Sequence, residues 1–141
     1  MNIDFNLQYH ENEGFFQTVE FDGNVISFSV DGLLAVDVER ANAEVKRVWE
    51  LVLNNLENIK CFISRTIWNK YKSLCDIVES QHKLMKNLPM LSSINIDFGS
   101  VVEIVFDDIK LDEIFDGSCY EIVAHADCDG CMNNVFLHKY S

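Results

Sequence analysis

The sequence has one proline and six glycines in 141 residues, and basic residues are scarce, with 11 Lys and Arg against 23 Asp and Glu. The formal charge of −12 argues against a nucleic-acid binder, because phosphates would repel such a surface. No apolar run approaches the roughly 18 residues of a membrane span. The acidic, alternating start, Met1 to Asp4, does not resemble a signal peptide. Zinc-protease, nucleophile-elbow and phosphate-loop motifs are also missing, so we expect no enzyme.

Apolar residues, by contrast, make up 48% of the chain, and a disordered segment would have far fewer. A chain of this length buries about two-thirds of its unfolded surface, enough for one core, so we expect a single domain over residues 1–141. The five cysteines are an odd number. This predicts a reducing cytoplasm and no disulfide framework.

The negative charge is concentrated in the two ends of the chain. Residues 1–38 contain seven acids and no base, and residues 90–141 contain ten acids and two bases. Residues 39–89 contain six acids and nine bases. The hydrophobic period changes near the same boundaries, from two to three or four and back. The sequence therefore predicts anionic strands and a nearly neutral helix layer.

The first 38 residues have a strand pattern. Apolar and polar residues alternate from Ile3 to Tyr9, and Asp22-Gly23 is typical of a two-residue hairpin turn. That turn pairs Phe21 with Asn24 and sets the register of both strands. One face then collects Phe15, Val19, Ile26, Phe28 and Val30, with Phe16 and Val25 left on the other.

The middle of the chain has a helical stripe, which consists of Val45, Val48, Trp49, Val52, Leu56, Ile59, Ile63 and Ile67. The stripe nearly continues to Val78, and one helix of that reach would be about 50 Å long, too long for so small a domain. We expect a break between about Asn58 and Asp76, then a short helix to about Lys86.

The last third alternates again, with strands around Gly99-Ser100 and a final hairpin turning at Asp129-Gly130. Glu103 is out of phase if the first of these turns is tight. The final hairpin pairs Ile122 with Leu137 and Ala124 with Val135, and it places Val123 beside Phe136 on the opposite face. The predicted fold is therefore α+β: an antiparallel sheet built from N-terminal and C-terminal hairpins, with one long and one short helix packed on one face.

The sharpest chemical pattern surrounds the final turn. Four ligands of the right types for zinc are present: Cys119, His125, Cys128 and Cys131. However, Asp129-Gly130 serves the turn, and strand parity puts His125 and Cys128 on opposite faces. A redox motif lacks its usual βαβ context. We predict no metal and no cofactor, and keep a metal or thiol site at Cys128 and Cys131 as an alternative.

The second pattern is an acid-rich connection with Asp107, Asp108, Asp112, Glu113 and Asp116. It lacks the ligand spacing and central glycine of an EF-hand, and nothing supports a glycosidase pair. Ile109, Leu111, Ile114 and Phe115 are interleaved with the acids. Two interpretations remain open. The connection is either a solvated loop whose apolar residues pack into the core, or an anionic docking surface whose apolar residues anchor a partner.

Several short segments carry a family resemblance. They are Trp49, Leu91-Ser92-Ser93-Ile94-Asn95-Ile96 with Gly99, Val105-Phe106-Asp107-Asp108, and Ile114-Phe115-Asp116-Gly117-Ser118-Cys119-Tyr120. In this order they resemble a group of small bacterial domains of unknown function. Some members of that group are taken to be immunity proteins of polymorphic toxins. The resemblance implies a similar fold and a toxin-binding role.

Together these features favour a cytoplasmic binding protein, an immunity protein that masks the active site of a cationic, nuclease-type toxin. Its predicted partner-binding residues are Asp107, Asp108, Asp112, Glu113 and Asp116. We expect a monomer or weak homodimer, with no nucleic-acid or membrane partner. The alternatives are the metal or thiol site and an acidic docking subunit unrelated to toxins.

Overall fold

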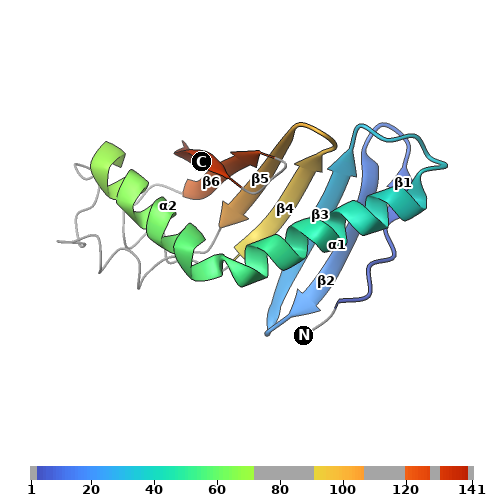
Figure 1. Ribbon diagram of the computed structural model, residues 1–141, viewed down its shortest axis with the longest axis horizontal. Coiled ribbons are helices and arrows are strands. Elements are labelled where there is room, and N and C mark those ends of the chain that lie inside the picture. Colours follow the sequence, from blue (N-terminus) through green and yellow to red (C-terminus); the bar gives the residue numbers. More distant parts are fainter. Residues whose placement is uncertain (1–2, 72–90, 107–119, 128–130, 140–141) are drawn as a thin grey trace.

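The computed structural model describes residues 3–71, 91–106, 120–127 and 131–139. Its elements are β1 (Gln8–His10), β2 (Gly14–Phe21), β3 (Asn24–Asp31), α1 (Val38–Asn54), α2 (Leu56–Tyr71), β4 (Leu91–Asp97), β5 (Val101–Phe106), β6 (Tyr120–Asp127) and β7 (Met132–Lys139). The seven strands form one sheet in sequence order, and α1 crosses it on one side (Figure 1). α1 packs over β3, and α2 lies against β7. The predicted α+β class is confirmed.

The sheet is antiparallel at every junction except one. β3 and β4 run parallel, with Phe28 beside Ile94 and Val30 beside Ile96. A parallel pair needs a crossover connection, and α1 and α2 are part of the chain that links these two strands. The prediction of a wholly antiparallel sheet is therefore wrong at the junction of its two halves.

The register predicted for the first hairpin is confirmed. Phe15 pairs with Val30, and Phe21 pairs with Asn24. The turn residues Asp22 and Gly23 have φ of 53° and 82°, the left-handed values that a type I′ turn requires.

The segment before this hairpin forms less strand than predicted. β1 begins at Gln8, whereas alternation predicted a strand from Ile3. The backbone N–H of Leu7 donates to the side-chain oxygen of Asn42 on α1, at 2.9 Å. Because a helix side chain takes up this donor, the segment is tied to α1 instead of to a neighbouring strand at that point, and Leu7 is buried.

The helical stripe is confirmed, since Val45, Val48, Trp49, Val52, Ile59, Ile63 and Ile67 are all buried. The break falls at Asn55, before the predicted interval, and it divides the described helical residues between helices of 17 and 16 residues. Asn55 Nδ2 donates to the carbonyl of Leu51 at 2.9 Å, so this side chain competes for a helical acceptor. The predicted short helix to about Lys86 lies outside the described residues.

The turn between β4 and β5 is longer than a tight hairpin. Ile96 pairs with Val102 and Asn95 with Glu103, so three residues, 98–100, form the connection. An odd number of turn residues shifts the phase of the second strand by one position. Glu103 therefore shares a face with Asn95, which explains why it was out of phase for a two-residue turn.

The final hairpin has the predicted pairs Ile122–Leu137 and Ala124–Val135. A bulge then shifts the register so that Ala126 pairs with Met132, and the turn itself lies outside the described residues. Val123 is 4% exposed although it points away from the helices. The prediction that this hairpin is partly covered on both sides is thus confirmed. Neither described helix is long and apolar enough to cross a membrane.

Candidate functional site

The open face is defined here as the side of the sheet that points away from the helices. On the other side, alternate residues of the strands join the buried core with α1 and α2. The polar and charged open-face positions are Thr18, Glu20, Ser27, Ser29, Asp31, Ser93, Asn95, Asp97, Glu103, Glu121, His125, Asn134 and His138. These residues come from six strands, and they make this face a broad polar surface.

A row of hydrogen bonds crosses the centre of the open face. The Ser29 hydroxyl donates to Asn95 Oδ1 at 2.8 Å, and Asn95 Nδ2 donates to Glu103 Oε1 at 3.1 Å. The other oxygen of Glu103 lies 3.3 Å from Nε2 of His125. The row therefore links β3, β4, β5 and β6 through side chains that point to the same side.

The row positions a carboxylate and an imidazole but does not form a nucleophilic site. The Glu103 and His125 side chains are 38% and 29% exposed, and the His125 ring meets Phe136 edge-on at 5.3 Å. The row contains two hydroxyls, Ser29 on β3 and Ser93 on β4, where Ser93 Oγ accepts from Asn95 at 3.4 Å. These strands lie three and two strands from β6, about 14 and 10 Å. A base must reach its nucleophile within hydrogen-bonding distance. What the row can do is hold Glu103 in a fixed orientation at a partly exposed position.

Charge is sorted between the two layers of the fold. The open face carries five carboxylates, which are Glu20, Asp31, Asp97, Glu103 and Glu121. Asp127, at the end of β6, instead accepts from the backbone N–H of Cys131. Among the described strands, no Lys or Arg occupies an open-face position. The helices α1 and α2 instead carry six Lys and Arg against four Glu. The open face is thus far more anionic than the helix layer.

The sequence-predicted site residues are only partly covered by the structure. Asp107, Asp108, Asp112, Glu113 and Asp116 lie outside the described residues, as do Cys119 and Cys128. His125 lies on the open face beside Glu103, whereas Cys131 lines a pocket on the helix side of the sheet. These two candidate ligands are therefore not brought together. Within the described ranges, no three His, Cys, Asp or Glu side chains are grouped as a metal ion would need.

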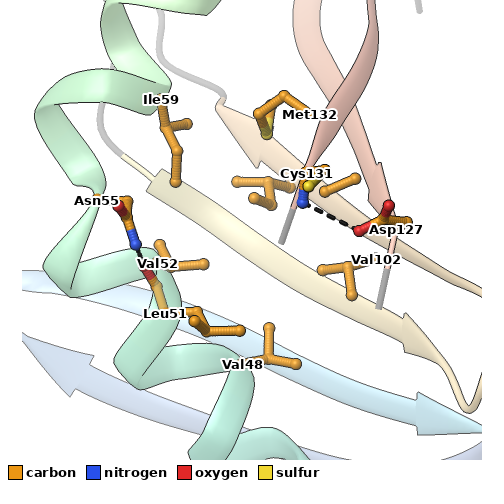
Figure 2. A pocket seen from close by; sticks show the side chains of 11 residues that line it. Val48, Leu51, Val52, Asn55, Ile59, Val102, Asp127, Cys131 and Met132 are labelled. Carbon is orange, nitrogen blue, oxygen red and sulfur yellow. Dashed lines mark hydrogen bonds between the residues drawn. The ribbon is translucent and has the colours of Figure 1, made fainter. Parts of the chain in front are cut away.

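That pocket lies between the two helices and the end of the sheet near β6 and β7 (Figure 2). Its volume is about 190 Å³. Its lining is mostly apolar, with Val48, Leu51, Val52, Ile59, Val102, Ile104, Ala126 and Met132, and the polar members are Asn55, Asp127 and Cys131. It lies where the helix breaks at Asn55. Ligand pockets of about 300 Å³ or more are usual for cofactor-sized molecules, so this one is small.

Two of the polar groups at this pocket have hydrogen-bond partners inside the protein. Asn55 Nδ2 donates to the Leu51 carbonyl, and Asp127 Oδ1 accepts from the backbone N–H of Cys131 at 3.0 Å. A ligand that hydrogen-bonded to these atoms would have to replace an internal bond. We therefore regard the open face, not this pocket, as the candidate functional site.

The sequence alone did not identify the central row. The one indication in the sequence was that Glu103 is out of phase for a tight turn. Which face Glu103 occupies could not be decided without the length of that turn. Comparison with protein-family models, with curated proteins and with solved structures finds no match for this chain. The functional assignment accordingly depends on the residues of the open face.

Proposed function

We propose that this chain is a binding protein that holds a cationic protein partner against the open face of its sheet. The sorting of charge carries the proposal: five carboxylates share that face, and none of its described positions holds Lys or Arg. Complementary charge steers diffusing partners together and can raise association rates by 10-fold to 1,000-fold. The same charge repels nucleic acid and anionic lipid, so a basic protein is the partner that fits.

Within this class, the proposed partner is a nuclease-type bacterial toxin, and the proposed role is that of a cytoplasmic immunity protein. An enzyme that cleaves nucleic acid must hold phosphates, so its active site is cationic. An anionic sheet face that docks there would mask the site and compete with the substrate. The resemblance to small bacterial domains that include immunity proteins supports this role. The chain would act as a monomer or weak homodimer.

The sheet is suited to this role because its central carboxylate is held in place before binding. Glu103 accepts from Asn95, and Asn95 also accepts from Ser29, so these side chains lose little freedom when a partner docks. The acidic connection of residues 107–119 follows Phe106 at the end of β5 and precedes β6. We include its five acids, which are the predicted partner-binding residues, as a second part of the binding surface.

The test is association with a catalytically inactive toxin domain encoded beside the gene for this chain. The open-face variant carries Glu20→Gln, Asp31→Asn, Asp97→Asn and Glu121→Gln. The control variant removes four exposed acids from elsewhere, with Asp4→Asn, Glu39→Gln, Glu50→Gln and Glu57→Gln. Association rates are measured by stopped flow between 20 and 500 mM NaCl.

We expect association of the wild-type chain to slow by at least about 10-fold as salt rises, since exposed charges are screened. The open-face variant should associate more slowly at low salt and depend less on salt, while the control variant stays close to the wild type. If the open-face variant and the control variant have the same association rates and the same salt dependence, the partner does not bind at the open face. Association that does not depend on salt, or no binding at all, would overturn the proposal itself.

A third variant tests the acidic connection by changing Asp107, Asp108, Asp112, Glu113 and Asp116 to Asn or Gln. Full protection against the toxin by this variant would show that these five residues are dispensable. The metal or thiol alternative has no structural observation in its favour among the described residues. Metal analysis of protein purified without chelators tests it directly.

A further inference from the structure

The connection between β3 and α1 exposes large apolar side chains. Leu34 is 72% exposed and Val36 is 83% exposed, and Val38 at the start of α1 is 38% exposed. Single exposed apolar residues are ordinary on protein surfaces. Here Leu34 and Val36 lie within three residues of each other, on a turn that polar residues could form equally well. Together they expose a concentrated apolar surface to solvent.

This turn is fixed by its own hydrogen bonds. The N–H of Asp37 donates to the carbonyl of Leu34 at 2.9 Å, and Asp37 Oδ2 accepts from the N–H of Leu34 at 3.0 Å. The Asp37 carbonyl then accepts from Ala41 in α1 at 3.0 Å. Because these bonds hold both ends of the turn, the backbone that carries Leu34 and Val36 has one arrangement, and little backbone entropy remains to be lost on binding.

The turn also adjoins the acidic end of the open face. Phe98 N–H donates to the carbonyl of Asp31 at 3.0 Å, and the Asp97 carboxylate lies beside Gly32, just before the turn. The nearby base, Arg40, lies 4.9 Å over the ring of Phe98 and 3.8 Å from Asp37. In Figure 1 the connection runs from the end of β3 beyond the sheet to the start of α1. The apolar tip thus begins two residues after Gly32, which lies beside the Asp97 carboxylate at the acidic end of the open face.

We propose that Leu34 and Val36 form an apolar anchor that enters an apolar pocket of the cationic partner, with Asp31 and Asp97 contacting the basic rim of that pocket. The inference rests on the proposed function. It assigns the slow dissociation of the complex mainly to Leu34 and Val36. Interfaces concentrate their binding energy in a few buried apolar anchors surrounded by a polar rim.

The adjoining charges favour this occupant over two others. An anionic lipid surface would be repelled by Asp31 and Asp97. A second copy of the chain would bring the same carboxylates face to face, and like charges across an interface are costly. A basic protein with an apolar pocket could bury Leu34 and Val36 and could also place its basic residues beside Asp31 and Asp97.

The experiment compares Leu34→Ser/Val36→Ser with a control in the same turn, Ala35→Ser, using the inactive toxin domain as the probe. All three side chains are exposed, so thermal unfolding should change little for either variant. We expect the double variant to dissociate roughly 30-fold faster, as the loss of an anchor of hot-spot size implies, with the salt dependence of association unchanged. The control should dissociate at the wild-type rate.

The outcomes separate the anchor from the proposed function. If the open-face variant slows association but Leu34→Ser/Val36→Ser leaves dissociation unchanged, the anchor is wrong and the function stands. If the wild-type chain does not bind the domain, both fail. Binding of the wild type to phosphatidylcholine–phosphatidylglycerol vesicles that the double variant abolishes would assign the turn to a membrane. A dimer in size-exclusion chromatography that the same variant abolishes would assign it to self-association. Either result overturns the anchor.

Discussion

Asp31 and Asp97 occupy matching register positions at the ends of the parallel strands β3 and β4. Both are exposed, and both follow the parity of the open face, so two like charges lie side by side on neighbouring strands. Pairs of this kind destabilise a sheet by a few tenths of a kcal/mol to about 1 kcal/mol. This charge pair therefore costs stability, a cost that the proposed docking of a basic partner would offset.

Asp97→Asn should therefore raise the free energy of unfolding, by about 0.5 kcal/mol at low salt, because it removes one charge of the pair. Urea unfolding at 20 mM and 500 mM NaCl measures the change. The gain should shrink at high salt, since exposed charges are screened there. Glu50→Gln, an exposed acid on α1, serves as a control with the same change in net charge. A loss of stability on Asp97→Asn would contradict this account.

The central row makes a second prediction, at Asn95. Asn95→Asp would set a second carboxylate where Nδ2 now donates to Glu103, 3.1 Å away. Two carboxylates at this distance disfavour the doubly charged form. The variant should lose about 2 kcal/mol of unfolding free energy relative to wild type at pH 7. The difference should shrink towards pH 4, where one carboxyl can take up a proton and donate it to the other.

Asn95→Ala provides the matched control for this substitution. It removes the hydrogen bonds of Asn95 with Ser29 and Glu103 without adding a charge, and about 1 to 2 kcal/mol should be lost. That loss should change much less between pH 7 and pH 4 than the loss from Asn95→Asp. Urea unfolding of both variants and the wild type at the two pH values supplies the comparison. Parallel pH dependence of the two variants would show that Asn95 and Glu103 do not interact in solution.

Local patterns predicted the first hairpin better than any other part of the fold. A two-residue turn at Asp22-Gly23 sets the register of both strands at once, and the alternation of apolar residues agrees with that register. The helix break was misplaced because the apolar stripe runs through it with unchanged spacing. What ends α1 is a short-range event, the Asn55 side chain donating to the Leu51 carbonyl, which hydrophobic periodicity does not reveal.

The open face was harder to predict because it depends on which strands meet. Ser29 and His125 are far apart in sequence, and they share one row only because β3 pairs in parallel with β4 and β4–β5 has a three-residue turn. A two-residue β4–β5 turn would put Glu103 on the other face, and a different β3–β4 pairing would separate Ser29 from Asn95. The sequence did show that the acidic residues are concentrated in the two ends of the chain and that the middle is nearly neutral. The pairing of the strands decides which face of the sheet carries these acidic residues.

Trp49 supplies a third prediction. Its ring meets Phe21 and Phe28 edge-on, at 5.0 Å and 5.4 Å, while its Nε1 is buried with no hydrogen-bond partner in the structure as described. Trp49→Phe would lose buried area but would also remove a donor whose burial is costly. We expect it to cost about 1 kcal/mol in urea unfolding.

Trp49→Ala is the comparison, since it removes the aromatic contacts as well as the donor. It should cost about 3 to 5 kcal/mol, the range for deletion of a buried aromatic side chain. If Trp49→Phe is as destabilising as Trp49→Ala, then Nε1 has a partner in solution or the full indole shape is essential. A small cost for both would instead mean that Trp49 does not pack in the core.

The fourth prediction concerns the β1–β2 turn, which lies at the same end of the sheet as Asp31. Gly14 and Gly23 have nearly equal φ, 80° and 82°, so an Ala at either position is strained by a similar amount, about 1 to 2 kcal/mol. A Cβ at Gly23 would meet nothing within 4 Å. At Gly14 it would lie 2.8 Å from the Val30 carbonyl oxygen and would also clash with the Asp31 carboxylate.

Gly14→Ala should therefore destabilise the chain more than Gly23→Ala does, by about a further 1 to 2 kcal/mol, because a backbone carbonyl of β3 must move. Adding Asp31→Ala should restore only part of the loss, since the Val30 carbonyl stays in place. Urea unfolding of the single and double variants completes the cycle. Equal losses at the two glycines would mean that the β1–β2 turn does not lie against the end of β3. In that case Gly14 would not pack against the Asp31 side chain, and the position of Asp31 would not depend on this turn.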